Sequence, residues 1–345
     1  MIRFESDYLE GAHPRVLELL GQTNFNQTPG YGEDLYCEKA RGLIKTLCKD
    51  DTIEVQFLVG GTQTNATVIA SILRPYQGVI SAETGHINVH ETGAIEATGH
   101  KVLSLPSSDG KITAKGVKIL VENHWNDMTH EHMVQPGMVY ISNPTENGTL
   151  YTKKELEELS EVCHELSLPL YLDGARMGYG LMAEGNDLFL PDITRLCDVF
   201  YIGGTKVGAL FGEALVITNA AIKKDFRYMI KQHGGMLAKG RLLGLQFIAL
   251  LEDELYYKIS THANKMAYLI RDAFKEKGYS FLYDSRTNQQ FPIVPNEVLK
   301  NLEEKYAFSF WKSMEKDHSA VRFCTSWATR EEDVEKLIED LQKIG

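Results

Sequence analysis

A lysine and an aspartate stand where two short apolar runs end, and both have side chains suited to catalysis. Residues 199–202 are apolar and lead into the segment 203–206, Gly-Gly-Thr-Lys. An amine in a partly desolvated pocket has a lowered pKa and can attack a carbonyl carbon to form a covalent adduct. Lys206 is therefore a candidate nucleophile. The alternative is an ordinary solvated lysine.

A second apolar run, residues 170–172, is followed by Asp173, Gly174 and Arg176. In open α/β sheets, ligands bind outside the carboxyl ends of the strands, so Asp173 and Arg176 are placed to contact one. The alternative for these two residues is an ion pair within the chain.

A glycine-rich segment, residues 60–65, follows a third apolar run and precedes a helical pattern. Glycine lets a ligand approach the backbone, and amides at a helix start favour phosphate, so Gly61 and Thr62 are candidate phosphate contacts. The segment matches neither the GxGxxG fingerprint nor the P-loop, so no dinucleotide or NTPase site is supported. A turn with a helix cap and no ligand is the alternative.

Taken in chain order, a phosphate cradle, an acid at a strand end and a later lysine are the arrangement of a pyridoxal-phosphate enzyme. The sequence resembles the threonine aldolase family, within the β-eliminating lyase group that has the aspartate aminotransferase fold. The resemblance covers nearly the whole chain. It rests on Ser6-Asp7, GTQTN at 61–65, Gly85-His86, Asn147-Gly148, DGAR at 173–176, TKVG at 205–208 and Val321-Arg322.

The resemblance implies pyridoxal 5'-phosphate as the cofactor and a role for each matching residue. Lys206 is expected to hold the cofactor covalently and to move protons. Asp173 is expected to pair with the pyridinium nitrogen, so that the ring can take up electrons. His86 is expected to stack on the ring and to act as a base.

The same resemblance implies which residues bind the cofactor phosphate and which bind the substrate carboxylate. The cofactor phosphate is expected to contact Gly61, Thr62 and Thr205, with Arg176 also in the cofactor site. The substrate carboxylate is expected to contact Ser6, Arg176 and Arg322, because a guanidinium binds a carboxylate with two parallel hydrogen bonds.

Two positions depart from the family pattern. Glu146 stands where threonine aldolases commonly have a histidine before Asn-Gly, so it is either the base for the substrate β-hydroxyl or a polar wall residue. Leu237 stands where an arginine is expected. Lys231, Lys239 and Arg241 are then the candidates for a cation that reaches the phosphate of a neighbouring subunit.

The function expected from the resemblance is cleavage of L-threonine or L-allo-threonine to glycine and an aldehyde. One alternative keeps the cofactor residues but eliminates a β-substituent from serine, cysteine or an aromatic amino acid. A less favoured alternative is a non-catalytic cofactor-binding protein.

Composition excludes several other classes of protein. Lys plus Arg number 36 and Asp plus Glu 47, a net charge of −11 that gives no electrostatic footprint for nucleic acid or an anionic membrane. The N-terminus has no apolar signal region, and no run reaches the roughly 20 apolar residues of a membrane helix.

Five scattered cysteines without CxxC argue against disulfides. The segment 86–90, HINVH, lacks the interior Glu of zinc-binding motifs, so no metal is expected. We expect a cytosolic protein.

Alternating apolar runs and helical patterns predict an α/β fold with a mainly parallel sheet. Strands are expected at 55–59, 78–82, 101–105, 138–142, 170–172, 199–202 and 214–218, and helices at 62–73, 86–97, 113–123, 152–166 and 220–230. Short strands near 280–283, 291–294 and 321–325 and a helix at 330–344 predict a small α+β C-terminal domain. The expected division is an N-terminal arm, 1–15, a large cofactor-binding domain, 16–250, and a small domain, 251–345. The family fold implies a homodimer or homotetramer with shared active sites.

Overall fold

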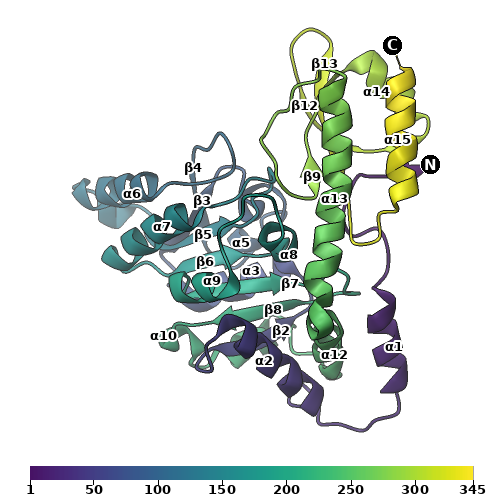
Figure 1. Cartoon of the computed structure of the whole chain (residues 1–345). Helices are drawn as coiled ribbons and strands as arrows, with labels where there is room; N and C mark the ends of the chain where they lie inside the picture. The colour runs from purple at the N-terminus through teal and green to yellow at the C-terminus, as the bar shows by residue number, and fades with distance from the viewer. Residues whose placement is uncertain (345) are drawn as a thin grey trace.

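The computed structural model describes residues 1–344 and is organised around one seven-stranded sheet (Figure 1). The strand order is β2 (Glu54–Leu58), β8 (Glu213–Ile217), β7 (Val199–Gly203), β6 (Leu170–Asp173), β5 (Gln135–Ser142), β3 (Gln77–Ala82) and β4 (Lys101–Leu105). Strand β8 pairs antiparallel with β2 and β7, while the pairs among β7, β6, β5, β3 and β4 are parallel. All seven strands expected in this region are present, so the predicted mainly parallel sheet is confirmed.

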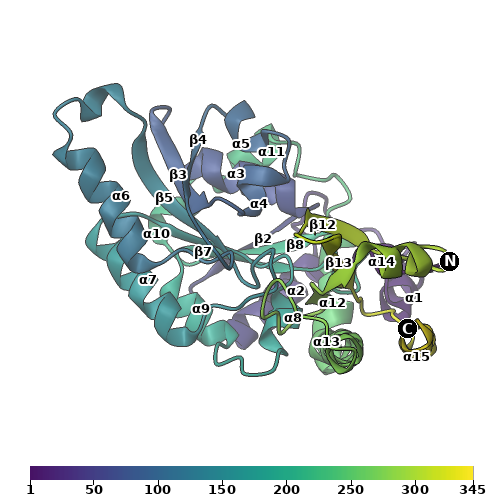
Figure 2. The same ribbon diagram turned by 90° about the horizontal axis from the view of Figure 1, so that it is seen from above.

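Helices cover both faces of this sheet, as Figure 2 shows. One face carries α2 (Leu35–Cys48), α6 (Ala114–Asn126), α7 (Lys153–Glu165) and α9 (Leu190–Leu196), and the other carries α3 (Gly61–Ile72), α5 (Ala94–Ala97) and α11 (Phe226–Gln232). Because both faces are covered, successive residues of the inner strands β6, β7 and β8 are all buried. In β7, Phe200 and Ile202 belong to one apolar core and Val199 and Tyr201 to the other. Such strands have continuous apolar sequences instead of alternating ones.

Two of the expected helices are interrupted. The pattern at 86–97 forms two short helices, α4 (His86–Val89) and α5, because Thr92 and Gly93 between them have φ of 53° and 71°. The pattern at 220–230 divides into α10 (Ala220–Lys223) and α11, with Asp225 at φ 60°. Positive φ is incompatible with a continuing right-handed helix. By contrast, the predicted start of α7 is confirmed, with a capping box between Thr152 and Glu155.

The long helical stretch after residue 236 forms α12 (Arg241–Leu251), the 3-10 turn η2 (Glu252–Glu254) and the 22-residue α13 (Leu255–Glu276). The first half of α13 packs into the core of the sheet through Tyr256 and Ile259. The second half of α13 packs into a separate core through Ile270 and Phe274. Figure 1 shows α13 extending from the sheet to the C-terminal elements.

The C-terminal elements are β9 (Gln289–Gln290), β10 (Ile293–Pro295), α14 (Asn296–Glu303), β11 (Tyr306–Ala307), β12 (Ser309–Ser313), β13 (His318–Cys324) and α15 (Glu331–Lys343). The expected strand at 280–283 is wrong: there, Phe281 makes one isolated bridge to Pro292. The expected final helix is confirmed as α15.

The N-terminus joins this C-terminal unit. Strand β1 (Ile2–Arg3) pairs in parallel with β11, and Phe4 is buried in the separate C-terminal core. Helix α1 (Pro14–Gln22) returns to the sheet core through Val16. These two cores support two units, but the sheet core continues through Ala263 of α13, so the expected boundaries at residues 15 and 250 stay a proposal. Within residues 1–344, no helix is long and apolar enough to cross a membrane.

Candidate functional site

The predicted site residues follow the carboxyl ends of neighbouring strands. His86 begins α4 shortly after β3, and Glu146 follows β5. Asp173 is the last residue of β6, and Lys206 lies just beyond β7. Because these strands are parallel, their carboxyl ends lie at one edge of the sheet (Figure 2). The topology therefore brings together residues that are far apart in the sequence.

Asp173 is the centre of a buried hydrogen-bond network. Its Oδ1 accepts from the Tyr201 hydroxyl at 2.5 Å and from the Ala175 amide at 3.0 Å. Its Oδ2 accepts from the Tyr140 hydroxyl at 2.6 Å and from Asn65 Nδ2 at 3.1 Å. Burial opposes ionisation, but nearby His86 and the two tyrosine hydroxyls hold the pKa of Asp173 below its usual range. The group is therefore a fixed anion.

Asn65 and Glu91 connect Asp173 to His86. Asn65 Nδ2 also donates to Glu91 Oε1 at 2.7 Å, and the same oxygen is 2.8 Å from His86 Nδ1. The Tyr171 hydroxyl donates to Asn65 Oδ1 at 2.7 Å, which fixes the orientation of the amide. Glu91 is buried and His86 is partly exposed. A carboxylate on Nδ1 sets which imidazole nitrogen carries the proton, and so leaves Nε2 for a ligand.

Glu146 faces the same network from the loop after β5. Its Oε1 accepts from the His86 amide at 3.0 Å and from the Ser142 hydroxyl at 2.7 Å. Its Oε2 is buried and has no hydrogen-bond partner within residues 1–344. Burial raises the pKa of Glu146, although the Ser142 hydrogen bond opposes the shift. A carboxylate with one free oxygen and a raised pKa is suited to accept a proton.

Lys206 lies in a tight turn after β7. The Tyr179 hydroxyl donates to the Lys206 carbonyl oxygen at 2.5 Å, which anchors its backbone. Burial lowers the pKa of Lys206, and the positive charge of Arg176 lowers it further. Both effects favour the neutral, nucleophilic amine.

The expected phosphate contacts lie at the start of α3 and in the turn before Lys206. The first N–H groups of an α-helix have no partner within the helix, so those of Gly61 and Thr62 are free to donate to an anion. A Cβ on Gly61 would lie 3.1 Å from the Tyr201 hydroxyl, so a side chain there would crowd the network around Asp173. Thr205 Oγ1 accepts from the Gly212 amide at 3.0 Å.

Arg176 forms the ion pair that the sequence left as an alternative, and its partner is Asp7. The two side chains are buried and joined by two bonds, Nε to Oδ2 at 2.7 Å and Nη2 to Oδ1 at 3.0 Å. Asn288 Nδ2 donates to the same carboxylate at 2.9 Å. Burial opposes ionisation, but the Arg176 guanidinium helps to hold the pKa of Asp7 at about 2. Within the described chain, Nη1 of Arg176 makes no hydrogen bond, so this nitrogen remains for a ligand.

Arg322 on β13 reaches the site from the C-terminal unit. Its Nη2 donates to the Glu5 carbonyl oxygen at 2.7 Å, and its Nη1 donates to Gln289 Oε1 at 3.1 Å. Its guanidinium carbon lies 5.5 Å from the centre of the Trp311 ring. Ser6, next to Glu5, is buried. The N-terminal segment thus lies beside both arginines that the sequence assigned to the substrate carboxylate.

Comparison with known proteins identifies the family. A model of the beta-eliminating lyase family matches residues 6–296. The chain belongs to the beta-eliminating lyase family. Its resemblance to threonine aldolases is confirmed by a low specificity L-threonine aldolase from Pseudomonas sp. (strain NCIMB 10558), which is 30% identical over 99% of this chain and 97% of its own length.

Solved structures agree with this assignment. The threonine aldolase of Leishmania major is 44% identical to this beta-eliminating lyase, with a TM-score of 0.97 over 100% of this chain and 99% of its own. A Thermus thermophilus aspartate aminotransferase has a TM-score of 0.74 at 15% identity, over 100% of this chain and 92% of its own. The predicted fold, that of pyridoxal-phosphate enzymes related to aspartate aminotransferase, is therefore confirmed.

The three candidate cations of this beta-eliminating lyase differ in their contacts. Arg241 donates to the carbonyl oxygens of Asn26 and Thr23 at 2.6 and 2.7 Å. Lys231 lies 4.9 Å from the centre of the Tyr31 ring, and Lys239 is exposed. All three therefore lie outside the network around Asp173. That one of them reaches the cofactor phosphate of a neighbouring subunit stays a prediction.

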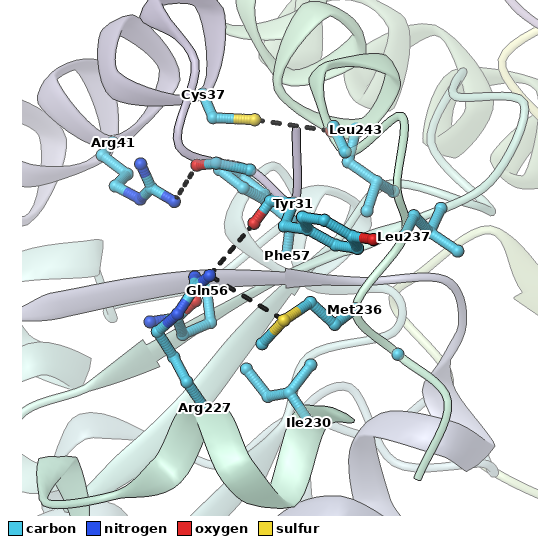
Figure 3. Close-up of a pocket in the computed structure, with 13 residues that line it drawn as sticks. Tyr31, Cys37, Arg41, Gln56, Phe57, Arg227, Ile230, Met236, Leu237 and Leu243 are labelled. Atoms are coloured by element: carbon cyan, nitrogen blue, oxygen red, sulfur yellow. Dashed lines mark hydrogen bonds between the residues drawn. The ribbon is translucent and has the colours of Figure 1, made fainter. Parts of the chain in front are cut away.

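A separate pocket of the beta-eliminating lyase lies between α2, β2 and residues 235–243 (Figure 3). Its two arginines bind its own walls: Arg41 donates to the Gly32 carbonyl oxygen at 2.6 Å, and Arg227 to that of Tyr31 at 3.2 Å. No residue predicted for the active site lines this pocket. It is therefore distinct from the candidate site.

Sequence reasoning missed several residues of the network. Asn65 appeared only as the end of a matching motif, and Glu91 was not among the predicted site residues. The tyrosines at positions 140, 171 and 201 lie within apolar strands, a position that predicts a buried core side chain. Alternation within β5, β6 and β7 places all three rings on the same face of the sheet, and this was the signal available to find them.

Proposed function

We propose that this lyase uses pyridoxal 5'-phosphate to cleave L-threonine or L-allo-threonine to glycine and an aldehyde. One observation carries the cofactor assignment: Asp173 is held as an anion by four donors, beside a lysine whose amine is held toward its neutral form. The relatives named as threonine aldolases support the substrate.

The residues of the chain fit the cofactor. Asp173 would pair with the pyridinium nitrogen and Lys206 would hold the aldehyde carbon, while His86 would lie on the ring face. Gly61, Thr62 and Thr205 would bind the phosphate. When bound, pyridoxal phosphate supplies a ring that takes up the electron pair left at Cα.

The arginines would orient the substrate. Arg322 and the free Nη1 of Arg176 would bind the carboxylate, with Ser6 beside them. A carboxylate fixed in this way would limit rotation about the bonds at Cα and so help to select which of them is broken. Asp7 would hold Arg176 in place while the substrate binds.

Glu146 would remove the proton from the substrate β-hydroxyl through its unpartnered Oε2. The Cα–Cβ bond then breaks and an aldehyde leaves. A proton returned to Cα by Lys206 gives glycine. The Ser142 and His86 contacts on Oε1 would keep Oε2 directed at the substrate.

We also propose that at least two copies associate and that the protein is cytosolic. The support for association is a set of exposed apolar side chains: Phe25, Tyr31, Leu35 and Tyr228 are 93%, 47%, 64% and 77% exposed. Tyr31 lines the pocket of Figure 3, and Tyr228 follows Arg227, which donates to the Tyr31 carbonyl oxygen. Exposed apolar side chains gathered in one region mark association surfaces. Sedimentation velocity would give one species of at least twice the chain mass.

The deciding experiment is product detection by NMR after incubation with pyridoxal phosphate and either L-threonine or L-allo-threonine. Lys206→Ala is the blank, and substitution of an exposed lysine on α14, Lys300→Ala, is the matched control. Glycine and acetaldehyde from the unmutated protein and the control, but not from the blank, would support the proposal. Pyruvate from serine or cysteine without aldol products would favour β-elimination, and cofactor binding without any turnover would favour a non-catalytic role.

A further inference from the structure

Glu213 is a buried carboxylate that the proposed reaction does not use. It is the first residue of β8, the strand that runs opposite to its neighbours β2 and β7. Its amino-terminal end therefore lies at the edge where the parallel strands end. In register, Glu213 stands opposite Gly203, three residues before Lys206. Its exposed fraction is 3%.

Glu213 closes the turn that carries Lys206. We call residues 203–206 the lysine turn. The amide of Gly204 donates both to Glu213 Oε2 and to the Gly212 carbonyl oxygen, at 3.0 Å each. The Thr205 amide donates to the same Gly212 oxygen at 3.1 Å. The contact is close, since a Cβ on Gly204 would lie 2.6 Å from that oxygen.

The charge of Glu213 depends on the groups around it. Burial raises the pKa of Glu213 to about 8, against the lowering effects of the Thr205 hydroxyl, the Gly204 amide and Lys206. Asp173 raises it further. The remaining ionisable neighbours are the hydroxyls of Tyr171, Tyr201 and Tyr256. At neutral pH the side chain is therefore mainly protonated, and it becomes an anion as the pH rises through 8.

We infer that Glu213 is a positioning residue for Lys206: its side chain holds the lysine turn, and its ionisation helps to set the charge of the Lys206 amine. A carboxylate anion near an ammonium group favours the charged form of that group. The attraction delays deprotonation of Lys206 once Glu213 has ionised. The inference rests on the proposed role of Lys206 as the group that holds the cofactor.

The test is the pH at which Lys206 becomes reactive. Full-length protein without cofactor is labelled with limiting acetic anhydride from pH 6 to 10.5, and the Lys206 peptide is quantified by mass spectrometry. In Glu213→Gln the amide oxygen still accepts from Gly204, but the anion is gone. We expect the labelling midpoint of Lys206 to fall, with about threefold to tenfold more labelling near the original midpoint. An unchanged midpoint would overturn the inference.

Two controls make the result specific. Glu165→Gln removes an exposed carboxylate on α7 and should leave the Lys206 midpoint unchanged. The peptide that contains Lys300, an exposed lysine on α14, gives the labelling of a solvent-exposed lysine in each sample. A midpoint that moved equally in Glu165→Gln would also overturn the inference.

A second measurement needs no substitution. Carbon-13 NMR of glutamate-labelled wild-type protein should show the Glu213 carboxyl resonance titrating near pH 8. Titration of Glu213 near pH 4 would contradict the inference even if Glu213→Gln did not fold.

The cofactor proposal is tested separately in the same samples. Pyridoxal phosphate should protect Lys206 from acetylation in both the wild type and Glu213→Gln. Failure of protection would count against the cofactor assignment, whereas the midpoint measured without cofactor would still decide the role of Glu213.

Discussion

Asp7 and Arg176 are 169 residues apart in sequence and form a buried ion pair with two hydrogen bonds. The pair joins the N-terminal segment to the strand-end motif that also contains Asp173. Its Asp is further bound by Asn288, which precedes β9. One carboxylate therefore connects three distant parts of the chain at the edge of the candidate site.

Asp7→Asn should lower the stability of the protein by about 3 kcal/mol or more, because it leaves the Arg176 charge buried without its partner. Urea unfolding at pH 7 measures this loss. Glu165→Gln breaks an exposed pair with Lys118 and should change stability little. Equal losses of stability in Asp7→Asn and Glu165→Gln would contradict a stabilising role for the buried pair.

The Asp7 pair should also contribute to acid unfolding. The pKa of Asp7 is lowered from 3.8 to about 2 in the folded state, so its stabilisation is fully present above pH 4. This stabilisation is lost as the pH falls from about 4 to about 2. In Asp7→Asn, stability should therefore change less over this range than in the wild type.

Glu146→Gln should lower kcat for threonine cleavage by about a hundredfold or more, the usual contribution of a general base. The amide oxygen can still accept from Ser142 and the His86 amide, so cofactor binding should be retained. In the wild type, kcat should rise as Glu146 ionises, at a pH above the normal range for glutamate because burial raises the pKa of this group. A wild-type kcat in Glu146→Gln would show that Glu146 is a wall residue.

Glu91→Gln should release the His86 ring, because it removes a charge-assisted hydrogen bond of about 1.5–3 kcal/mol. The nitrogen-15 shifts of labelled His86 should show loss of the Nδ1-protonated form, and kcat should fall roughly tenfold. Glu96→Gln, an exposed neighbour on α5, is the control. Identical histidine spectra in the wild type and Glu91→Gln would exclude this role.

Gly174→Ala should destabilise the protein by about 3 kcal/mol, since the new Cβ would overlap the Tyr201 carbonyl oxygen. The contrasting variant is Gly21→Ala in α1, where no atom lies within 4 Å of the added Cβ. Gly21 lies in the last turn of α1, where alanine is favoured over glycine, so this variant should gain up to about 0.5 kcal/mol. Thermal unfolding measures the stability of both variants. A Gly174→Ala protein as stable as the wild type would show that β7 can move away from the added Cβ.

The sheet was predictable because its strands are short apolar runs separated by helical patterns. Asp173 and Lys206 were predictable as site candidates for the same reason: each ends such a run, and parallel strands end at one edge. Thr152 and Glu155 have the spacing of a capping box, a local pattern that predicts where a helix starts.

Features that depend on contacts between distant segments were not predictable. The pairing of Asp7 with Arg176 depends on how the N-terminal segment crosses the sheet edge. Glu91 joins the site because Thr92 and Gly93 interrupt the expected helix there. Glu213 lies near Lys206 because β8 runs antiparallel to β7. The direction of a strand within a sheet cannot be predicted from a run of apolar residues.

The pairing of β1 with β11 has a consequence for the order in which the protein can assemble during synthesis. Residues 2–4 are made long before residues 305–324, yet the Ile2 and Phe4 amides donate to the carbonyl oxygens of Lys305 and Ala307, and the Phe4 carbonyl accepts from the Cys324 amide. A nascent chain that ends before residue 305 has no strand partner for its own beginning. The segment that carries Asp7 therefore gains its last backbone partner only after residue 324 has been made.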